Sequence, residues 1–439
     1  MNRFVSTSVL NFRTICWIVI VIGCCEFGCC SADGGSIKIC GIESNKLVVS
    51  QGVYDFGVCV LFSSDSIDGV WRPVANKYIT DSVLSFGISN EKPICFYRVC
   101  CAEILPTPAG FTNLIKSYGV LTTIAGAGGT GNDVNKWMAE FEGGPAVNAL
   151  LSRPHIAMAD RCGNVYIADK SAHAIRKVDK HGLIHTIAGI NSPGDGADGP
   201  SVAREVALNE PNGLYVLPDG VIYILDLANL KVRRLATNGI METVCYIPDL
   251  TIGRGLWVSE DESTIYVASG GVVYRWGRND GLEVYASGFI ELGNVVVAPD
   301  GNLVVTDRGG HRVVKILPDR TQVVIAGNGM TYGGGDGYRA TETGLNEVRG
   351  VWFLADGSFF VCTHRGSQIW YIDRGGYIHL FLNGYRSNTH AGDGQWFYNP
   401  YEYRISEVRA VVVDYEGNIL ITENDSGYIR KIEFLWHGY

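Results

Sequence analysis

Charged residues are scarce in this chain of 439 residues: 18% are Asp, Glu, Lys or Arg, against 46% apolar residues. This composition excludes a disordered chain and indicates a globular protein with one large domain or two. Positive charge is not in excess either, because 36 Lys and Arg face 45 Asp and Glu, a net charge of −9. That balance argues against a broad nucleic-acid-binding surface, so no nucleic acid is expected as a partner.

Familiar catalytic sequences are also missing. The chain contains no HExxH, no Ser-His-Asp order and no phosphate-cradling glycine loop before a helix. The missing triad order weighs little, since triad members need not be adjacent in sequence. Glycine, in contrast, is plentiful: 55 residues, about one in eight, against a usual share of roughly 7%. Many tight turns are expected, and with them strands rather than long helices.

The first 32 residues read as a secretory signal. Arg3 and Arg13 precede an apolar run, Ile15 to Gly23, that falls far short of the roughly twenty residues of a spanning helix. Two cleavage sites stay open. Val21-Ile22-Gly23-Cys24 resembles a bacterial lipobox, which would leave a lipid on Cys24 and attach the protein to a membrane, whereas Cys30-Ser31-Ala32 suits ordinary signal peptidase. Export is expected in both cases.

Thirteen cysteines therefore meet an oxidising compartment. Five lie in the leader, and the five that offer disulfides are Cys40, Cys59, Cys95, Cys100 and Cys101. Two bridges and one thiol are expected there, with the pairing undetermined; zinc is a poor alternative because no CxxC pair or nearby His accompanies them. Cys162, Cys245 and Cys362 stand singly in separate repeats and are predicted to be small buried hydrophobes.

Residues 33–104 predict a small β-sandwich-like module. Strands are expected at 37–42, 46–49, 58–63, 83–88 and 95–99, with turn signals between them and no helical period. The stretch from Leu61 to Phe86, with a final FYR strand, resembles the compact β modules of secreted bacterial proteins. Residues 105–117, which contain Pro106, Pro108 and Gly110, are predicted to be a linker.

Residues 118–439 are a repeat. Each copy reads apolar strand, Asp-Gly-type turn, strand ending in an acid, basic strand, Gly turn and a fourth strand. In four copies the two turns are nineteen residues apart: Gly163 and Gly182, Gly220 and Gly239, Gly301 and Arg320, Gly357 and Gly376. A fifth copy, 263–281, is one residue shorter, and a sixth ends before its fourth strand.

A donor for that missing strand precedes the first copy. The segment Gly119 to Gly126 (GVLTTIAG) matches the fourth strands HTIAG and VIAG of other copies. Because borrowing a strand from the other end removes the last exposed edge, an all-β, six-bladed propeller closed by this N-terminal strand is predicted. A seven-bladed ring or an open solenoid are the alternatives.

The repeat resembles the NHL family. Matching stretches are LSRPHIAMADRCGNVYIADKSAHAIRKV, LNEPNGLYVLPDGVIYILDLANLKVRRL and GNVVVAPDGNLVVTDRGGHRVVKIL. Gly-Asp-Gly in three inter-blade loops, around Asp195, Asp336 and Asp393, also resembles extracellular members. The resemblance implies the propeller fold but no single activity, since NHL propellers include protein-binding, RNA-binding and enzymatic members. The acids of these loops are predicted to make local turns, because one Asp alone cannot hold calcium.

Equivalent positions at the start of strand one supply a candidate site. They are His155, Asn212, Arg254, Gly293 with Asn294 beside it, Arg349 and Arg409. Equivalent positions in a ring face one axis, so three guanidinium groups would repel one another unless an anion or the protein's own acids lay between them. An anion-binding site at the channel mouth is one hypothesis. The other is structural, with neighbouring Asp, Glu or carbonyl groups satisfying each arginine.

An enzyme is the second functional hypothesis. Gluconolactonase-like propellers hold a divalent metal with Glu, Asn and Asp, positions that are mostly cationic here, and amidating-lyase-like propellers need several His around zinc. His155, His173, His311 and His364 are predicted on one face, with His173 and His311 in turns where they bond locally. The acids that end strand two, Asp169, Asp226, Asp307 and Glu423, are expected to cap turns because they recur in most copies.

The sequence thus favours an exported, non-enzymatic propeller that binds an acidic glycan or an acidic peptide, with no cofactor. The last long loop carries Trp396, Tyr398, Tyr401 and Tyr403, which would either stack on sugar rings or plug the face.

Overall fold

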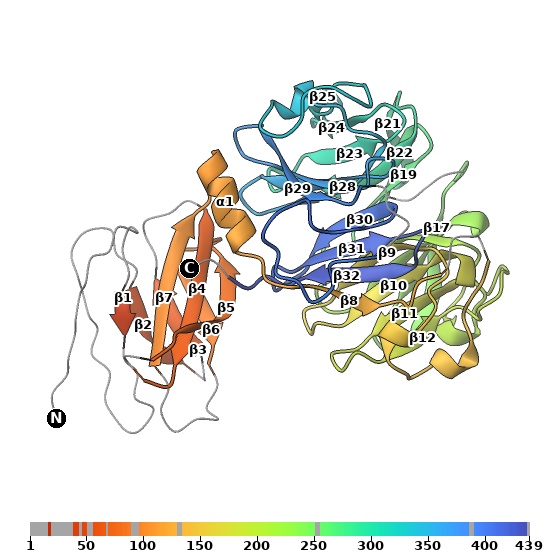
Figure 1. The fold of residues 1–439 in the computed structure, drawn as a ribbon. Coiled ribbons are helices and arrows are strands. Elements are labelled where there is room, and N and C mark those ends of the chain that lie inside the picture. The colour runs from red at the N-terminus through yellow and green to blue at the C-terminus, as the bar shows by residue number, and fades with distance from the viewer. Residues whose placement is uncertain are drawn as a thin grey trace. The chain divides into compact units, whose positions relative to one another are not determined.

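The computed structural model of the chain describes residues 16–18, 38–43, 46–50, 56–66, 69–88, 96–129, 134–250, 255–385 and 390–436. It divides into two compact units (Figure 1). The first comprises Met1–Val120, Trp396–Tyr398 and Glu433–Tyr439, and the second comprises Leu121–Gln395 and Asn399–Ile432.

The first unit holds two antiparallel sheets. One has the order β1 (Cys16–Ile18), β7 (Phe96–Glu103), β4 (Gly57–Ser64), β5 (Arg72–Tyr78), and the other β2 (Lys38–Glu43), β3 (Lys46–Ser50), β6 (Val83–Gly87). Their facing side chains share one core, in which Leu47 and Phe86 of the second sheet join Leu61 of the first. The predicted sandwich-like fold is confirmed, although β5 was not among the expected strands and β1 lies within the predicted signal segment.

One disulfide forms among the described residues of this unit. Cys59 of β4 bonds to Cys101, its direct partner on β7. Cys100 points to the opposite face of β7, where burial raises the pKa of its thiol although Arg98 lowers it. Cys95, one of the five expected pairing candidates, lies outside the described residues.

Helix α1 (Pro108–Lys116) occupies the segment that was predicted to be only a linker. The side chain of Thr107 accepts a hydrogen bond from the Gly110 backbone N–H, and Pro108 stands at the first turn, where a missing N–H costs nothing. The helix buries Leu114 and Ile115. The two prolines that indicated a linker are therefore part of a helix start.

The second unit contains six sheets among the described residues, and in each the strands lie in sequence order apart from β13, beside β17, and β8, which follows β32. Blade one is β9 (Pro154–Ala159), β10 (Val165–Asp169), β11 (Ala174–Val178) and β12 (Ile184–Ala188), and blade two is β14 (Pro211–Val216), β15 (Ile222–Asp226), β16 (Lys231–Leu235) and β17 (Ile240–Tyr246), with the short β13 (Ser201–Val202) added beside β17. Blade three is β18 (Gly255–Val258), β19 (Thr264–Ser269), β20 (Val272–Gly277) and β21 (Gly281–Ser287).

Blade four is β22 (Leu292–Val297), β23 (Leu303–Asp307), β24 (Arg312–Ile316) and β25 (Gln322–Ala326), and blade five is β26 (Val348–Phe353), β27 (Phe359–Thr363), β28 (Gln368–Ile372) and β29 (Ile378–Asn383). Blade six is β30 (Val408–Val413), β31 (Ile419–Glu423), β32 (Tyr428–Ile432) and β8 (Leu121–Ala125). Short 3-10 helices lie at Ala139–Phe141, Ala146–Asn148, Lys170–Ala172, Ala203–Glu205, Leu227–Asn229 and Ala340–Glu342.

The seam of the ring lies where the repeat predicted it. β8 completes blade six by pairing with β32, with Thr122 opposite Lys431 and Ala125 opposite Ile429. The first strand of every blade contacts the first strand of the next, and β30 of blade six contacts β9 of blade one. The unit is a closed six-bladed β-propeller, and the alternatives of seven blades or an open solenoid are wrong.

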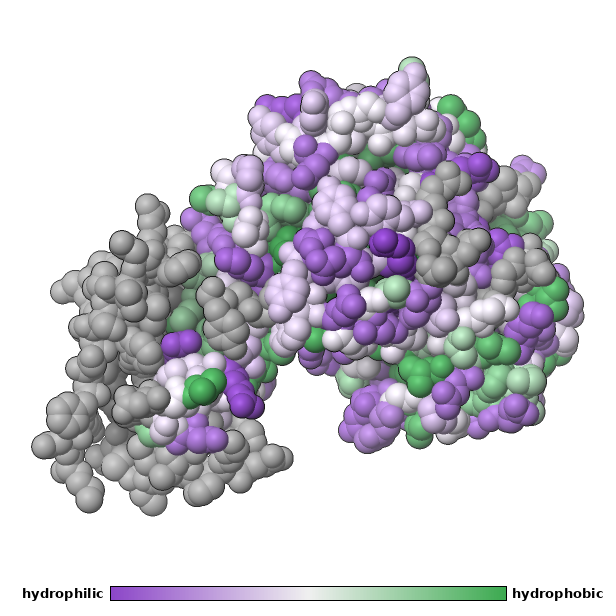
Figure 2. Space-filling view, viewed as in Figure 1, coloured by the Kyte–Doolittle hydropathy of each residue, from purple (hydrophilic) through white to green (hydrophobic). Residues whose placement is uncertain are grey.

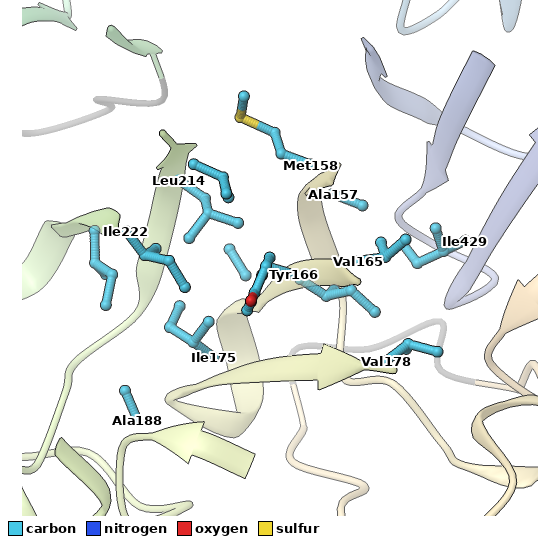
Figure 3. Close-up of a cluster of buried hydrophobic side chains, with 14 of the residues drawn as sticks. Ala157, Met158, Val165, Tyr166, Ile175, Val178, Ala188, Leu214, Ile222 and Ile429 are labelled. Atoms are coloured by element: carbon cyan, nitrogen blue, oxygen red, sulfur yellow. The ribbon is translucent and has the colours of Figure 1, made fainter. Parts of the chain in front are cut away.

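Apolar side chains fill the joints between blades. Around Tyr166 of blade one gather Leu214 and Ile222 of blade two and Ile429 of blade six (Figure 3). Each sheet is therefore covered on both faces by its neighbours, which explains strands that are buried along their whole length, such as β10 and β15. On the surface, hydrophilic residues lie among scattered hydrophobic ones (Figure 2).

The acids that end strand two cap turns, as predicted, and also bind a buried arginine. Asp169 accepts the Ser152 backbone N–H at 2.5 Å and the Arg176 Nε–H at 3.1 Å. Asp226 and Glu423 repeat this arrangement with Arg233 and Arg430. Each arginine is fully buried, and burial raises the pKa of Asp169 against the lowering effect of Arg176.

The prediction for the three single cysteines is right for two. Cys245 and Cys362 are buried, and burial raises the pKa of each thiol to about 12. Cys162 is exposed, because it lies in the turn between β9 and β10 and not in a strand. Among the described residues, no helix is long and apolar enough to cross a membrane.

Candidate functional site

The predicted ring positions are structurally equivalent. His155, Asn212, Gly293, Arg349 and Arg409 are each the second residue of their blade's first strand. In each of these blades the pairing with strand two shifts register at this point, which is a β-bulge. A bulge re-aims a side chain at the end of a ladder, so it lets these residues leave the alternation of the sheet.

One pocket gathers five of the six residues predicted for the site. Its lining includes His155, Asn212, Asn294, Arg349 and Arg409, and its cavity volume is about 20 Å³. Arg254 lies outside the described residues.

Hydrogen bonds from neighbouring residues fix the backbone at Arg349. The Thr306 hydroxyl of blade four donates to the Arg349 carbonyl at 2.6 Å, and Gly350 N–H donates to Cys362 Sγ at 3.2 Å. Its guanidinium group is 97% buried, with Nη2 at 3.2 Å from His364 Nδ1. Among the described residues, none accepts a hydrogen bond from Arg349 Nε or Nη1.

Glu407 lies between the two arginines. Its Oε1 is 2.8 Å from Arg409 Nη2 and 3.9 Å from Arg349 Nη2. Arg409 is 91% buried, and its Nε also finds no acceptor among the described residues. One carboxylate thus serves two buried guanidinium groups, where full pairing would require two.

Further ion pairs lie beside these arginines, and we call their acids, Glu347 and Glu407, the belt acids. His364 contacts both Glu407 and Glu347, with its Nδ1 at 2.6 Å from Glu347 Oε2. Arg308 Nη2 is 2.6 Å from the same Glu347 oxygen. Burial raises the pKa of Glu347, but the hydrogen bonds from His364 and Arg308 outweigh it and leave the pKa lowered.

The histidines do not form a metal cluster. His173 Nδ1 accepts the Glu210 backbone N–H and His311 Nδ1 accepts the Glu347 backbone N–H, both at 3.1 Å. Each bond joins a turn to the start of the next blade, so the prediction of local bonds in these two turns is wrong. In the part of the chain that the structure describes, no three His, Cys, Asp or Glu side chains are placed to hold a metal ion.

The loop acids bond to residues far along the chain, so the prediction of local turns is wrong, although Asp393 also contacts His390 of its own loop. Asp336 accepts the Leu380 backbone N–H at 2.9 Å, Asp393 contacts Arg430 Nη2 at 2.8 Å, and Asp195 pairs with Lys231 and Arg233. Each loop runs along the outer strand of the blade that follows it. Its acid therefore meets that blade's third or fourth strand.

The aromatic residues of the last loop divide into two groups. Tyr403 is fully buried, whereas Trp396, Tyr398 and Tyr401 are exposed. Tyr403 is therefore part of the packing of the loop, and the other three side chains are partly exposed to solvent.

Glu407 was missed by the sequence reasoning. It stands two residues before Arg409, and the same offset holds an acid in three other blades, at Glu210, Glu291 and Glu347. Such a recurrence signals a structural role. An alignment of the copies that extended two residues further upstream would have found it.

Solved structures share this fold over most of the chain. A protein of unknown function from Bacteroides thetaiotaomicron aligns with a TM-score of 0.57 and 15% identity over 88% of this chain and 94% of its own. An auxiliary nutrient binding protein from the same organism has a TM-score of 0.54 and 15% identity over 89% and 94%. The likeness is one of fold alone.

Curated relatives match only in part. Zebrafish (Danio rerio) teneurin-3 is 26% identical over 41% of this chain and 8% of its own length. Protein SUPPRESSOR OF QUENCHING 1, chloroplastic, from Arabidopsis thaliana is 25% identical over 53% of this chain and 26% of its own. The chain thus spans a small part of these relatives. No protein-family model matches it.

Proposed function

We propose that the protein is an exported, non-enzymatic NHL-type propeller that binds an anionic glycan or an acidic peptide at its channel mouth. The observation that carries this proposal is the pair of buried arginines, Arg349 and Arg409, that share the carboxylate of Glu407. Burying a charge without a full set of partners costs several kcal/mol, and a bound carboxylate or sulfate group would supply the missing acceptors.

The remaining lining suits the same class of ligand. Asn212 and Asn294 place amide groups beside the arginines, and amides bond both to sugar hydroxyls and to peptide groups. Export is supported by the leader pattern of residues 1–32. The nutrient-binding protein of the same fold supports a binding role. A lipid on Cys24 is a further prediction, and Cys24 lies outside the described residues.

The test is binding of the full chain to an array of acidic glycans and acidic peptides. Arg349→Gln and Arg409→Gln should each weaken binding about tenfold to a hundredfold, because a hydrogen bond to a charged group contributes about 1.5–3 kcal/mol. Arg365→Gln is the matched control: Arg365 also pairs with a belt acid, Glu347, but is 59% exposed and outside the pocket lining. Circular dichroism should show all three variants folded.

Unchanged binding in both pocket variants would remove the anion site. Metal analysis of the same preparations separates the alternative, a metal-assisted hydrolase or lyase. Zinc or calcium present at one ion per chain would favour that alternative.

A further inference from the structure

Four of the six blades have their outer strand covered by a segment of this same chain. We call these segments caps: residues 142–146 cover β12, 198–203 cover β17, 336–340 cover β29 and 393–395 cover β8. Each cap comes from the long connection that precedes its blade. Uncovered edge strands invite pairing with other chains, so the caps remove a liability.

Three of the caps share one geometry, and the cap of blade two differs, because Thr243 N–H there donates to the Asp198 carbonyl at 2.8 Å. In blade five, Gly337 N–H donates to the Ile378 carbonyl at 2.8 Å and Ile378 N–H donates to the Tyr338 carbonyl at 2.9 Å. Gly143 and Gly144 make the same two bonds to Ile184 in blade one. The cap is therefore an extended backbone that pairs with one strand residue.

An acid precedes the glycine in each cap and bonds two residues further along the strand. Asp336 Oδ1 accepts the Leu380 backbone N–H at 2.9 Å, and Glu142 accepts the Thr186 backbone N–H at 3.1 Å. Asp198 and Asp393 contact Thr243 and Thr123 at the same strand position. The shared recognition pattern is an acid followed by glycine in an extended segment.

Among the described residues none caps blade three or blade four, whose preceding connections, 247–254 and 288–291, are short. On β21, side chains of blade four take over part of the role: Arg320 Nη1 and Gln322 Nε2 donate to the carbonyls of Tyr285 and Ser287, each at 2.9 Å. On β25, no described residue bonds to the outer edge. Gln322 and Val324 there correspond to Ile378 and Leu380 of the capped blade five, and Val324 is 38% exposed.

We propose that the outer edge of β25 is a docking site for an extended peptide segment of a partner protein that carries an acid followed by glycine. The peptide backbone pairs with Gln322, and its carboxylate accepts the Val324 N–H. This is strand addition to a sheet edge, with the acid providing selectivity. The site is separate from the channel mouth and does not depend on the function proposed for it.

A partner segment fits this edge better than a second copy of the chain. In a second copy the four acid-Gly segments that form caps already cover that copy's own blades. Blade five also shows that no buried arginine is needed, since Trp370 occupies the third-strand position that Arg176 holds in blade one. Blade four has Val314 there. It therefore meets the requirements seen in blade five.

The test uses a labelled peptide that copies the blade-five cap, residues 333–343 (GGGDGYRATET), and fluorescence anisotropy with the full chain. Wild type should bind it, and Val324→Pro should weaken binding at least tenfold by removing the outward N–H. Proline is tolerated on an edge strand where its N–H faces solvent. A peptide with Asp changed to Ala should bind about fivefold more weakly or worse. Equal binding to wild type and Val324→Pro would mean that the peptide displaces the native cap, and would overturn the proposal.

A second variant keeps the test decisive if the proline variant does not fold. Replacing residues 288–291 by a copy of residues 327–347 should place a cap over β25, raise the melting temperature and abolish peptide binding. A folded graft that still binds the peptide as wild type does would contradict the proposal. So would sedimentation that shows a dimer of the wild type without peptide binding, because a second copy would then be the occupant.

Discussion

Buried arginines occupy two different environments in this ring. Arg176, Arg233 and Arg430 represent the first. Each lies at the third position of strand three, fully buried, and pairs with the acid that ends strand two. Arg349 and Arg409 are also buried but share a single carboxylate. Arg176 Nη2 and Arg430 Nε also lack an acceptor among the described residues, so the sharing of one carboxylate is what distinguishes Arg349 and Arg409 from the structural cations.

Arg176→Met should lower the free energy of unfolding by about 3–5 kcal/mol, because it leaves the fully buried Asp169 without its counter-charge. Urea denaturation followed by tryptophan fluorescence measures this. The matched control is Arg204→Met: Arg204 is 61% exposed and 3.6 Å from Glu142, so its loss should cost about 1 kcal/mol or less. Equal losses in the two variants would contradict the structural role of the buried pair.

Glu347 should make stability depend on pH in the acid range. Its pKa in the folded protein lies below the ordinary value of 4.5. Its stabilisation is therefore fully present above pH 4.5 and is lost as the pH falls through the folded pKa. Denaturation of wild type and Glu347→Gln at stepwise lower pH should show a difference that shrinks below pH 4.5. A difference that stays constant down to pH 3 would be the contrary outcome.

Among the structural elements, the bulge in strand one and the cap on strand four are two features that the period of the repeat does not predict. The bulge at the second residue of strand one turns Arg349 and Arg409 out of the ladder. The caps explain why four inter-blade connections are long and why their acids recur. The four long inter-blade connections thus each cover the outer strand of the blade that follows.

The seam between β8 and β32 offers a direct test of ring closure. Thr122→Cys combined with Lys431→Cys places two thiols directly opposite each other. The resulting disulfide should raise the free energy of unfolding by about 2–5 kcal/mol, since it closes a very long loop. Melting with and without reductant measures the effect, and each single-cysteine variant is the control. Failure of the pair to cross-link in folded protein would contradict the closed ring.

The six blades of the ring are not equivalent. Blades five and six supply Arg349 and Arg409, and blades five, six, one and two carry caps. Among the described residues, no backbone segment caps blade three or blade four, and Val284 and Val323 on their outer strands are exposed. The ring therefore has a central mouth with surplus positive charge and one uncovered sector on its rim.

The sequence alone determined the number of blades, the seam and the equivalence of the mouth positions. Repeat spacing and turn residues are local chemistry, so Gly163 and its counterparts place every strand without knowledge of the others. The error at residues 105–117 was local as well, since Pro108 starts a helix as readily as it interrupts one.

Only the tertiary structure decided that Glu407 lies between two arginines, that Asp336 bonds to Leu380, and that β25 is left uncovered. These contacts join neighbouring blades or join a loop to the blade after it. They depend on the angle at which the ring closes and on the path of each loop over a strand edge. Neither quantity is encoded in the spacing of a repeat, because the spacing is the same whether the next blade is capped or bare.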